Sequence, residues 1–147
     1  MNPLFNAIRH FAPWQQAVAA LQKGDCPALY DMSESQRAFF ACALQESLNR
    51  PVLYVAPGMQ AAMRAAEDCA ELTGGKAAVL PAGDIQFVQG TASRDSEWQR
   101  MAVFKKLRAG EIRVLCVSAE ALMQKFPLPF KGGDQIALSL GQRLEPL

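Results

Sequence analysis

Residues 51–56, with the sequence PVLYVA, are the segment that most restricts how this chain can fold. They are apolar or favour β-structure, and no polar residue alternates with them. This is the pattern of a strand that is buried on both faces of a parallel sheet. Because segments with helical spacing stand on both sides of this run, the sequence predicts an α/β fold.

Strand-like and helical segments alternate along most of the chain. At this spacing the strands are joined by right-handed crossovers, so we expect an open, three-layer arrangement of a parallel sheet with helices on both faces. The predicted strands are 27–32 (PALYDM), 51–56, 77–81 (AAVLP) and the start of 112–126, which continues into a short helix. Further helices are predicted at 13–23, from Ser33 or Ser35 to Leu48, at 59–72 and from about Asp95 to Arg108, and the tail 134–147 begins another strand.

Apolar faces on two of these helices are expected to pack on the sheet. The hydroxyl of Ser33 or Ser35 can cap the first of them, because it accepts a hydrogen bond from an unpaired amide of the first turn. Methionine at helical spacing in the second is typical of a core rather than of a ligand site. The two faces are Phe40, Ala43, Leu44, Ser47 and Leu48 in the first helix, and Met59, Ala62, Met63, Ala66 and Ala70 in the second.

The size and charge of the chain exclude several functional classes. Its 147 residues and 50% apolar content suit one domain with one sizeable core. Fifteen Lys and Arg stand against fourteen Asp and Glu, so the net charge of +1 gives no electrostatic reason to expect a nucleic-acid or membrane surface. No apolar run approaches the roughly 18 residues that cross a bilayer. We therefore expect a soluble, cytoplasmic protein with no membrane partner.

The four cysteines are expected to be reduced residues of the core. Cys26, Cys42, Cys69 and Cys116 are widely spaced, with no Cys-x-x-Cys pair, and His10 stands alone near the start of the chain. A zinc site normally has ligands closer together in sequence than these. Each cysteine lies in or beside an apolar segment, where a small buried thiol is common. The sequence therefore predicts neither a metal site nor a disulfide framework.

The turn at 31–38, DMSESQRA, stands where a phosphate-binding loop would join a strand to a helix. Such a loop needs glycines whose amides close on the phosphates, a lysine that neutralises them and a hydroxyl that binds magnesium. Here Asp31 and Gln36 occupy the glycine positions, Arg37 the lysine position and Ala38 the hydroxyl position. On the residues alone, an ordinary turn and the remnant of a phosphate loop are about equally good interpretations.

A family resemblance favours the remnant. Residues 29–72, LYDMSESQRAFFACALQESLNRPVLYVAPGMQAAMRAAEDCAEL, resemble the first domain of the bacterial excinuclease B subunit, where an intact phosphate loop occupies the corresponding turn. Residues 95–129 and 138–144 (LSLGQRL) resemble the same region of the transcription-repair coupling factor, a large DNA translocase with a helicase-like N-terminal module. The resemblance covers about residues 25–144. It implies a P-loop-NTPase-like or helicase-like fold whose phosphate loop is degenerate at Asp31, Gln36, Arg37 and Ala38.

The resemblance also implies a division of the chain. Residues 1–24 would be an N-terminal helical extension, 25–130 the helicase-like domain, and 131–147 the start of a small following domain or a final strand. In the excinuclease subunit a long tyrosine-rich hairpin grips DNA, but residues 82–94 here are short and have Phe87 as their sole aromatic residue. That DNA-gripping role is therefore not carried over. The family's GQRL segment leads into a domain that docks on excinuclease A, which is missing from this sequence.

These observations predict a non-catalytic scaffold from the N-terminus of a transcription-repair coupling factor. No catalytic, cofactor-binding or metal-binding residue is expected in it. Its partners would be other domains of the same protein and, through the adjacent domain, excinuclease A. The full-length protein would be the ATP-dependent translocase that meets RNA polymerase and DNA in nucleotide excision repair. Alone, the chain should bind duplex DNA negligibly at physiological salt, because counterion release contributes little.

Two other functions remain open on the sequence. The first is a domain that binds or hydrolyses a nucleotide through a non-standard loop. It is favoured by Arg37 at the start of a helix, where an anion would meet both the guanidinium and the helix dipole. The second is an α/β interaction module that has no connection with repair.

Overall fold

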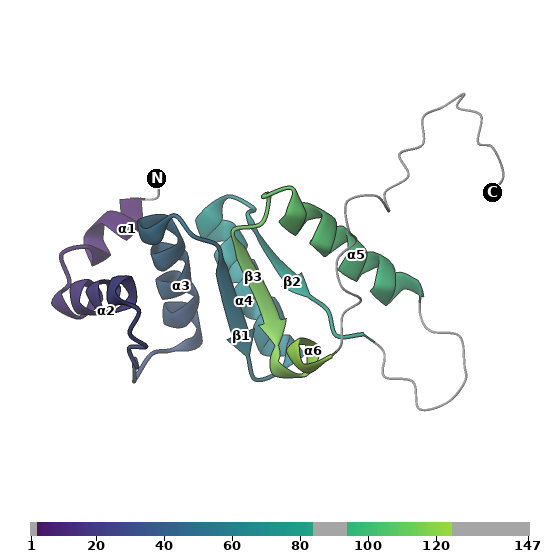
Figure 1. Cartoon of the computed structure of the whole chain (residues 1–147), viewed down its shortest axis with the longest axis horizontal. Helices are drawn as coiled ribbons and strands as arrows, with labels where there is room; N and C mark the ends of the chain where they lie inside the picture. The colour runs from purple at the N-terminus through teal and green to yellow at the C-terminus, as the bar shows by residue number, and fades with distance from the viewer. Residues whose placement is uncertain (1–2, 84–93, 125–147) are drawn as a thin grey trace, which may run out of the picture.

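A three-stranded parallel sheet lies at the centre of the chain (Figure 1). The structure is a computed structural model in which residues 3–83 and 94–124 are described. Strands β1 (Val52–Ala56) and β2 (Ala77–Leu80) each pair with β3 (Val114–Ser118), so the strand order is β1-β3-β2. The α/β class and the parallel sheet that the sequence predicts are confirmed.

Helices pack on both faces of this sheet (Figure 1). Helices α3 and α4 pack on one face, and α5 and α6 pack on the other. Helices α1 and α2 pack on α3 through two ring contacts, Phe5 with Phe39 and Trp14 with Phe40, at centroid distances of 5.3 and 4.7 Å. Helix α1 has no counterpart in the sequence prediction. The bounds are α1 Pro3–Ile8, α2 Ala12–Lys23, α3 Glu34–Leu48, α4 Met59–Thr73, α5 Arg94–Arg108 and α6 Ala119–Met123.

Small side chains bring α4 close to the sheet. On this face Val114 and Cys116 of β3 are fully buried against the helix. The helix contributes alanines and a cysteine, which let the backbones approach closely while leaving little void. On the opposite face a smaller cluster forms around Val117 of β3. The buried residues of α4 are Ala62, Ala65, Ala66 and Cys69.

A side-chain clamp joins three elements on that second face. The Gln124 side chain, just after α6, accepts from the Gly83 amide at 2.6 Å and donates to the Gly83 carbonyl at 3.0 Å. Its Oε1 also accepts from Arg100 Nη1 of α5 at 2.8 Å. A Cβ at Gly83 would lie 2.8 Å from that same Arg100 nitrogen, so glycine is the residue that leaves room for the clamp.

Strand β1 is buried on one face rather than on both, so that part of the prediction is wrong. Leu53 is 53% exposed and Val55 is 48% exposed. The physical reason is position: β1 is an edge strand of the described sheet, and on the second face the long helix α5 contacts β2, whereas β1 is met by the short helix α6. The uninterrupted burial predicted for β1 belongs instead to β3, the central strand, where four of five residues are buried.

Residues 27–32 do not form a strand, so the predicted first strand is also wrong. Tyr30 is 82% exposed and lies away from the core. Pro27 has no amide to donate to a neighbouring strand, and Asp31 has a left-handed φ of 59° that ends any extended run. An apolar run forms a strand only where another strand is available to pair with it. Local sequence does not indicate whether such a partner is available.

The predicted helix faces and the predicted burial of the cysteines need smaller corrections. Ser47 and Met63 are exposed although their apolar faces were predicted to pack on the sheet. In α4 the buried stripe is turned toward Ala65 and Cys69, because the helix packs on both α3 and the sheet. Cys42, Cys69 and Cys116 are buried as predicted, whereas Cys26 is exposed in the segment that does not form a strand.

The remaining element predictions are confirmed or fall outside the described residues. The helices at 13–23, 59–72 and 95–108, and the strands in 77–81 and 112–126, match α2, α4, α5, β2 and β3 closely. The predicted strand in 134–147 and the proposed boundary at 131 lie outside the described residues. Within 3–83 and 94–124, no helix combines the length and apolar character that a membrane span requires.

The two strand positions predict different costs for truncation. Val114→Ala removes two carbons from a fully buried site and leaves a cavity between the sheet and α4, so it should lower the free energy of unfolding by roughly 2–3 kcal/mol. Leu53→Ala removes more carbon from a half-exposed site and should cost about 1 kcal/mol or less. Urea midpoints of both variants test this. Equal midpoints would show that β1 is covered as fully as β3.

Candidate functional site

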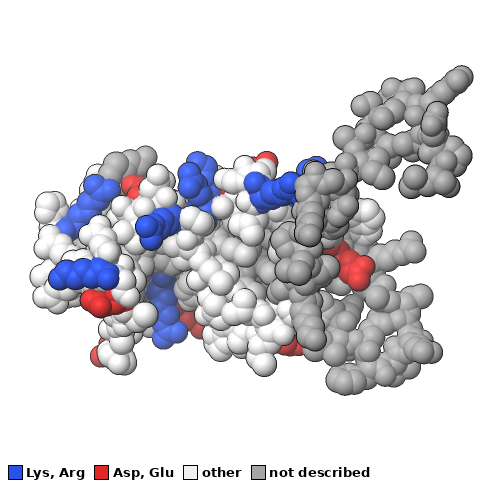
Figure 2. All heavy atoms as spheres, viewed as in Figure 1, with Lys and Arg blue, Asp and Glu red and all other residues white. Residues whose placement is uncertain are grey.

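A pocket of about 210 Å³ lies at the carboxyl end of β1, between the first turn of α3 and the outer face of α4. In open parallel sheets the carboxyl ends of the strands are where ligands usually bind. Charged side chains of both signs occupy this end of the molecule, in the lower part of Figure 2. The charged or hydroxyl residues that line the pocket are Glu34, Ser35, Arg37, Tyr54, Arg64, Glu67 and Asp68.

The first turn of α3 is closed by its own side chains. Ser33 Oγ accepts from the amide of Gln36 at 3.3 Å, and Gln36 Oε1 accepts from the amide of Ser33 at 2.8 Å. This reciprocal capping box satisfies two amides that a helix start otherwise offers to an anion. Of the two cap candidates, Ser33 is therefore correct, and Ser35 lies inside the helix.

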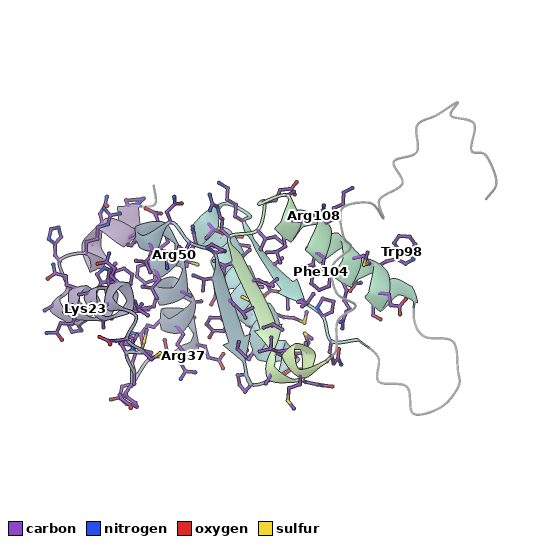
Figure 3. The ribbon with its side chains drawn as sticks, viewed as in Figure 1. Lys23, Arg37, Arg50, Trp98, Phe104 and Arg108 are labelled. Carbon is purple, nitrogen blue, oxygen red and sulfur yellow. The ribbon has the colours of Figure 1, made fainter. Side chains whose placement is uncertain are left out.

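The four positions of the predicted phosphate-loop remnant do not converge on one point. Asp31 is exposed and has a left-handed backbone conformation, and the Gln36 side chain forms part of the cap. Arg37 is exposed, and its Nε donates to the carbonyl of Met32 at 3.0 Å (Figure 3). Ala38 is fully buried in the core, where its carbonyl accepts from Cys69 Sγ at 3.7 Å. Only Arg37 among the four lines the 210 Å³ pocket.

Carboxylates outnumber guanidiniums around this pocket. Glu34, Glu67 and Asp68 stand against Arg37 and Arg64, and Glu34 already lies 3.8 Å from Arg64. Burial raises the pKa of Tyr54, while the neighbouring Arg37 acts in the opposite direction. The phenol is therefore neutral at pH 7 and adds no charge. A triphosphate would meet a net negative wall here, which opposes its binding.

A second, mostly apolar hollow of about 580 Å³ lies on the other side of the 31–38 turn. Side chains of α1, α2 and α3 line it together with the turn itself, including Phe11, Tyr30 and Phe40. Asp31 is the charged residue in its lining. Asp31 and Gln36 line this hollow, whereas Arg37 lines the other pocket.

Three buried thiols meet in the core although they are far apart in sequence. Cys42 of α3, Cys69 of α4 and Cys116 of β3 come from different elements. Hydrogen bonding with Cys69, followed by burial, raises the pKa of Cys42 and of Cys116, so both remain protonated thiols. Sequence spacing gave no sign of this cluster, since long-range packing creates it. Among the described residues, no group of three His, Cys, Asp or Glu side chains is arranged to hold a metal ion.

Comparison with known proteins identified no relative: no family model, curated protein or solved structure matches this chain. The resemblance to the excinuclease B subunit therefore rests on the residues quoted for it. The remaining evidence on function is the chemistry of the described side chains.

The capping box predicts different effects for two neighbouring substitutions. Ser33→Ala removes the acceptor for the Gln36 amide and should lower the free energy of unfolding by about 1 kcal/mol. Arg37→Ala removes an exposed side chain and should cost within about 0.5 kcal/mol. Ser33→Asp, which keeps a capping oxygen, serves as the control and should behave like the native chain. Urea denaturation of the three variants measures this, and a larger loss for Arg37→Ala would show that Arg37 is a structural anchor.

Proposed function

We propose that this chain is a non-catalytic interaction module from the N-terminus of a transcription-repair coupling factor. Its fold would be helicase-like, and its phosphate loop degenerate. The module would hold other domains of the same protein in place in the cytoplasm. Chemistry that consumes ATP and moves DNA would belong to a motor domain elsewhere in that protein.

The observation that carries this proposal is the closed first turn of α3. A phosphate loop works because free amides, a helix N-terminus and a lysine all point at the phosphates. Here the amides of Ser33 and Gln36 are satisfied by each other's side chains, and Arg37 donates to the carbonyl of Met32. Two amides at the helix start are therefore occupied, and the glycines and the lysine of a phosphate loop are absent.

Two further features support a remnant rather than an ordinary turn. Asp31, which stands at the first glycine position, is one of two described non-glycine residues with positive φ, a conformation that favours glycine. The other is Asn49, which ends α3. In addition, helix α3, which follows the turn, packs on a parallel α/β sheet, although the strand that precedes a phosphate loop is absent because residues 27–32 do not form one.

A nucleotide-binding function is the second candidate, and Arg37 is the observation in its favour. Its side chain lines the 210 Å³ pocket beside Tyr54, at the start of a helix of 15 residues. A nucleotide there would stack or hydrogen-bond with Tyr54 and place phosphate near Arg37 and Arg64. Three carboxylates in the same wall oppose this arrangement. An interaction module unrelated to repair would have the same closed turn. The domains encoded next to this sequence would distinguish it from a repair protein.

Calorimetric titration with magnesium-ATP tests the non-catalytic function. Because the amides are capped and the pocket wall is net negative, we expect no saturable heat at millimolar nucleotide and no phosphate release. Arg37→Ala is the matched variant, since Arg37 is the one of the four phosphate-loop positions that lines the pocket. Saturable binding by the native chain that Arg37→Ala abolishes would establish the nucleotide site instead.

The gene around this sequence tests the assignment to repair. The reading frame beyond Leu147 is expected to encode the excinuclease A docking domain, a polymerase-binding segment and a motor with an intact Gly-Lys-Thr loop. In that full-length protein, Arg37→Ala should leave ATP-dependent release of stalled polymerase unchanged. A downstream sequence without a motor would favour the unrelated interaction module.

A further inference from the structure

A basic residue stands at or just before the start of each strand. Arg50 precedes β1 by two residues, and Lys76 and Arg113 immediately precede β2 and β3. The strands are parallel and adjacent in the order β1-β3-β2, so these three residues lie at the same edge of the sheet. Their backbones are paired there: the backbone amide of Arg113 donates to the Lys76 carbonyl at 2.7 Å, and the Arg113 carbonyl accepts from the backbone amide of Val52 at 2.9 Å.

Helix α5 adds three more cations at this edge. It crosses back along the sheet and ends next to the start of β3, so its last turn lies beside the amino ends of the strands (Figure 1). Lys and Arg side chains gather along the upper part of Figure 2, and Arg50 and Arg108 are labelled on this side in Figure 3. We name this surface the basic edge: Arg50, Lys76, Lys105, Lys106, Arg108 and Arg113.

None of these six cations has an acidic partner in the described part of the chain. The ion pairs there are Arg9 with Glu46 and Arg64 with Glu34. Neighbouring strands are about 4.8 Å apart, so Lys76 and Arg113 repel each other at short range. The carboxyl ends of α3, α4 and α5 each contribute roughly half a negative charge, and Glu71 and Glu111 lie nearby. Together these negative charges offset only part of the six positive charges.

A hollow of about 600 Å³ opens beside Lys76 and Arg113. Its polar wall includes the ends of α3 and α4, with Gln45 and Thr73 among its lining residues. A carboxylate side chain that entered it would meet two cations, neutral hydrogen-bonding groups and one carboxylate, that of Glu46. Glu46 also lines the hollow, and its Oε1 lies 4.0 Å from Arg9 and has no hydrogen-bond partner in the described part of the chain, so its single negative charge offsets only part of the two positive charges.

We propose that the basic edge binds an acidic segment of a partner protein, with Lys76 and Arg113 receiving a carboxylate in the hollow. This surface deepens the interaction-module function and rests on it. A protein segment fits better than a nucleic acid, because the positive surface is short and interrupted by Glu46 and Glu111. The opposite end of the sheet carries an excess of carboxylates, so a long polyanion would gain little beyond the edge itself.

Fluorescence anisotropy with a fluorescein-labelled oligoglutamate peptide tests this surface at low and at physiological salt. Replacing Arg50, Lys76 and Arg113 by Gln should raise Kd about tenfold, because three exposed or half-exposed ion pairs are lost together. Since Arg113 is partly buried, a second variant replaces the exposed Lys105, Lys106 and Arg108 by Gln and should also raise Kd. Circular dichroism confirms that each variant folds.

The matched control removes the same charge elsewhere. Replacing Lys23, Arg37 and Arg64 by Gln should change Kd less than twofold, since these side chains lie away from the basic edge. If the control variant lost as much peptide affinity as the basic-edge variants, or if the native chain bound no peptide, the proposal would be overturned. Tighter binding of an oligothymidine strand than of the peptide would also overturn it and identify a nucleic-acid surface. The magnesium-ATP titration tests the interaction-module function by itself, so a failure of that function can be distinguished from a failure of the basic edge.

Discussion

The burial of β3 is the constraint on which the rest of the structure depends. This strand pairs with β1 on one side and β2 on the other, and Val114, Cys116 and Val117 are completely removed from water. A strand buried on both faces requires a helix layer above and below it. On one face the alanines of α4 meet that need, and on the other α5 and α6 do so. Even the last residue of β3 is used, since buried Ser118 caps α6 by accepting from the Ala121 amide at 3.1 Å.

Parallel topology also separates charge along the strand direction. All three strands begin at one edge, and the residues that lead into them are Arg50, Lys76 and Arg113. The carboxyl ends face the opposite edge, where Glu34, Glu67 and Asp68 surround the pocket at β1. Among the described residues, cations therefore gather at one end of the strands, whereas three carboxylates and two guanidiniums line the pocket at the other end. Net charge alone conceals such a surface, which is why composition gave no reason to expect one.

The start of α3 shows how local chemistry can close a potential site. A serine followed by glutamine three residues later forms a reciprocal cap that is recognisable in sequence. Once formed, it satisfies two of the amides that a helix start offers to an anion. Arg37 turns back to the Met32 carbonyl, and Ala38 enters the core. Gln36 and Ala38 thus have roles in helix capping and packing, and these roles explain their side chains without a ligand.

Local pattern was sufficient for most helices and for strands β1, β2 and β3, and it limited the cap of α3 to Ser33 or Ser35, because periodicity and capping act over a few residues. It failed where distant segments decide the outcome. Residues 27–32 have a strand-like composition but no strand to pair with, and β1 is half-exposed because it became an edge. The meeting of Cys42, Cys69 and Cys116, and the alignment of the basic edge, exist only after the crossovers are made. Sequence by itself determined most helices and the three described strands, and it limited the start of α3 to Ser33 or Ser35. The tertiary structure decided which strand is central, because hydrogen-bond pairing and burial are shared between segments that are far apart in the chain.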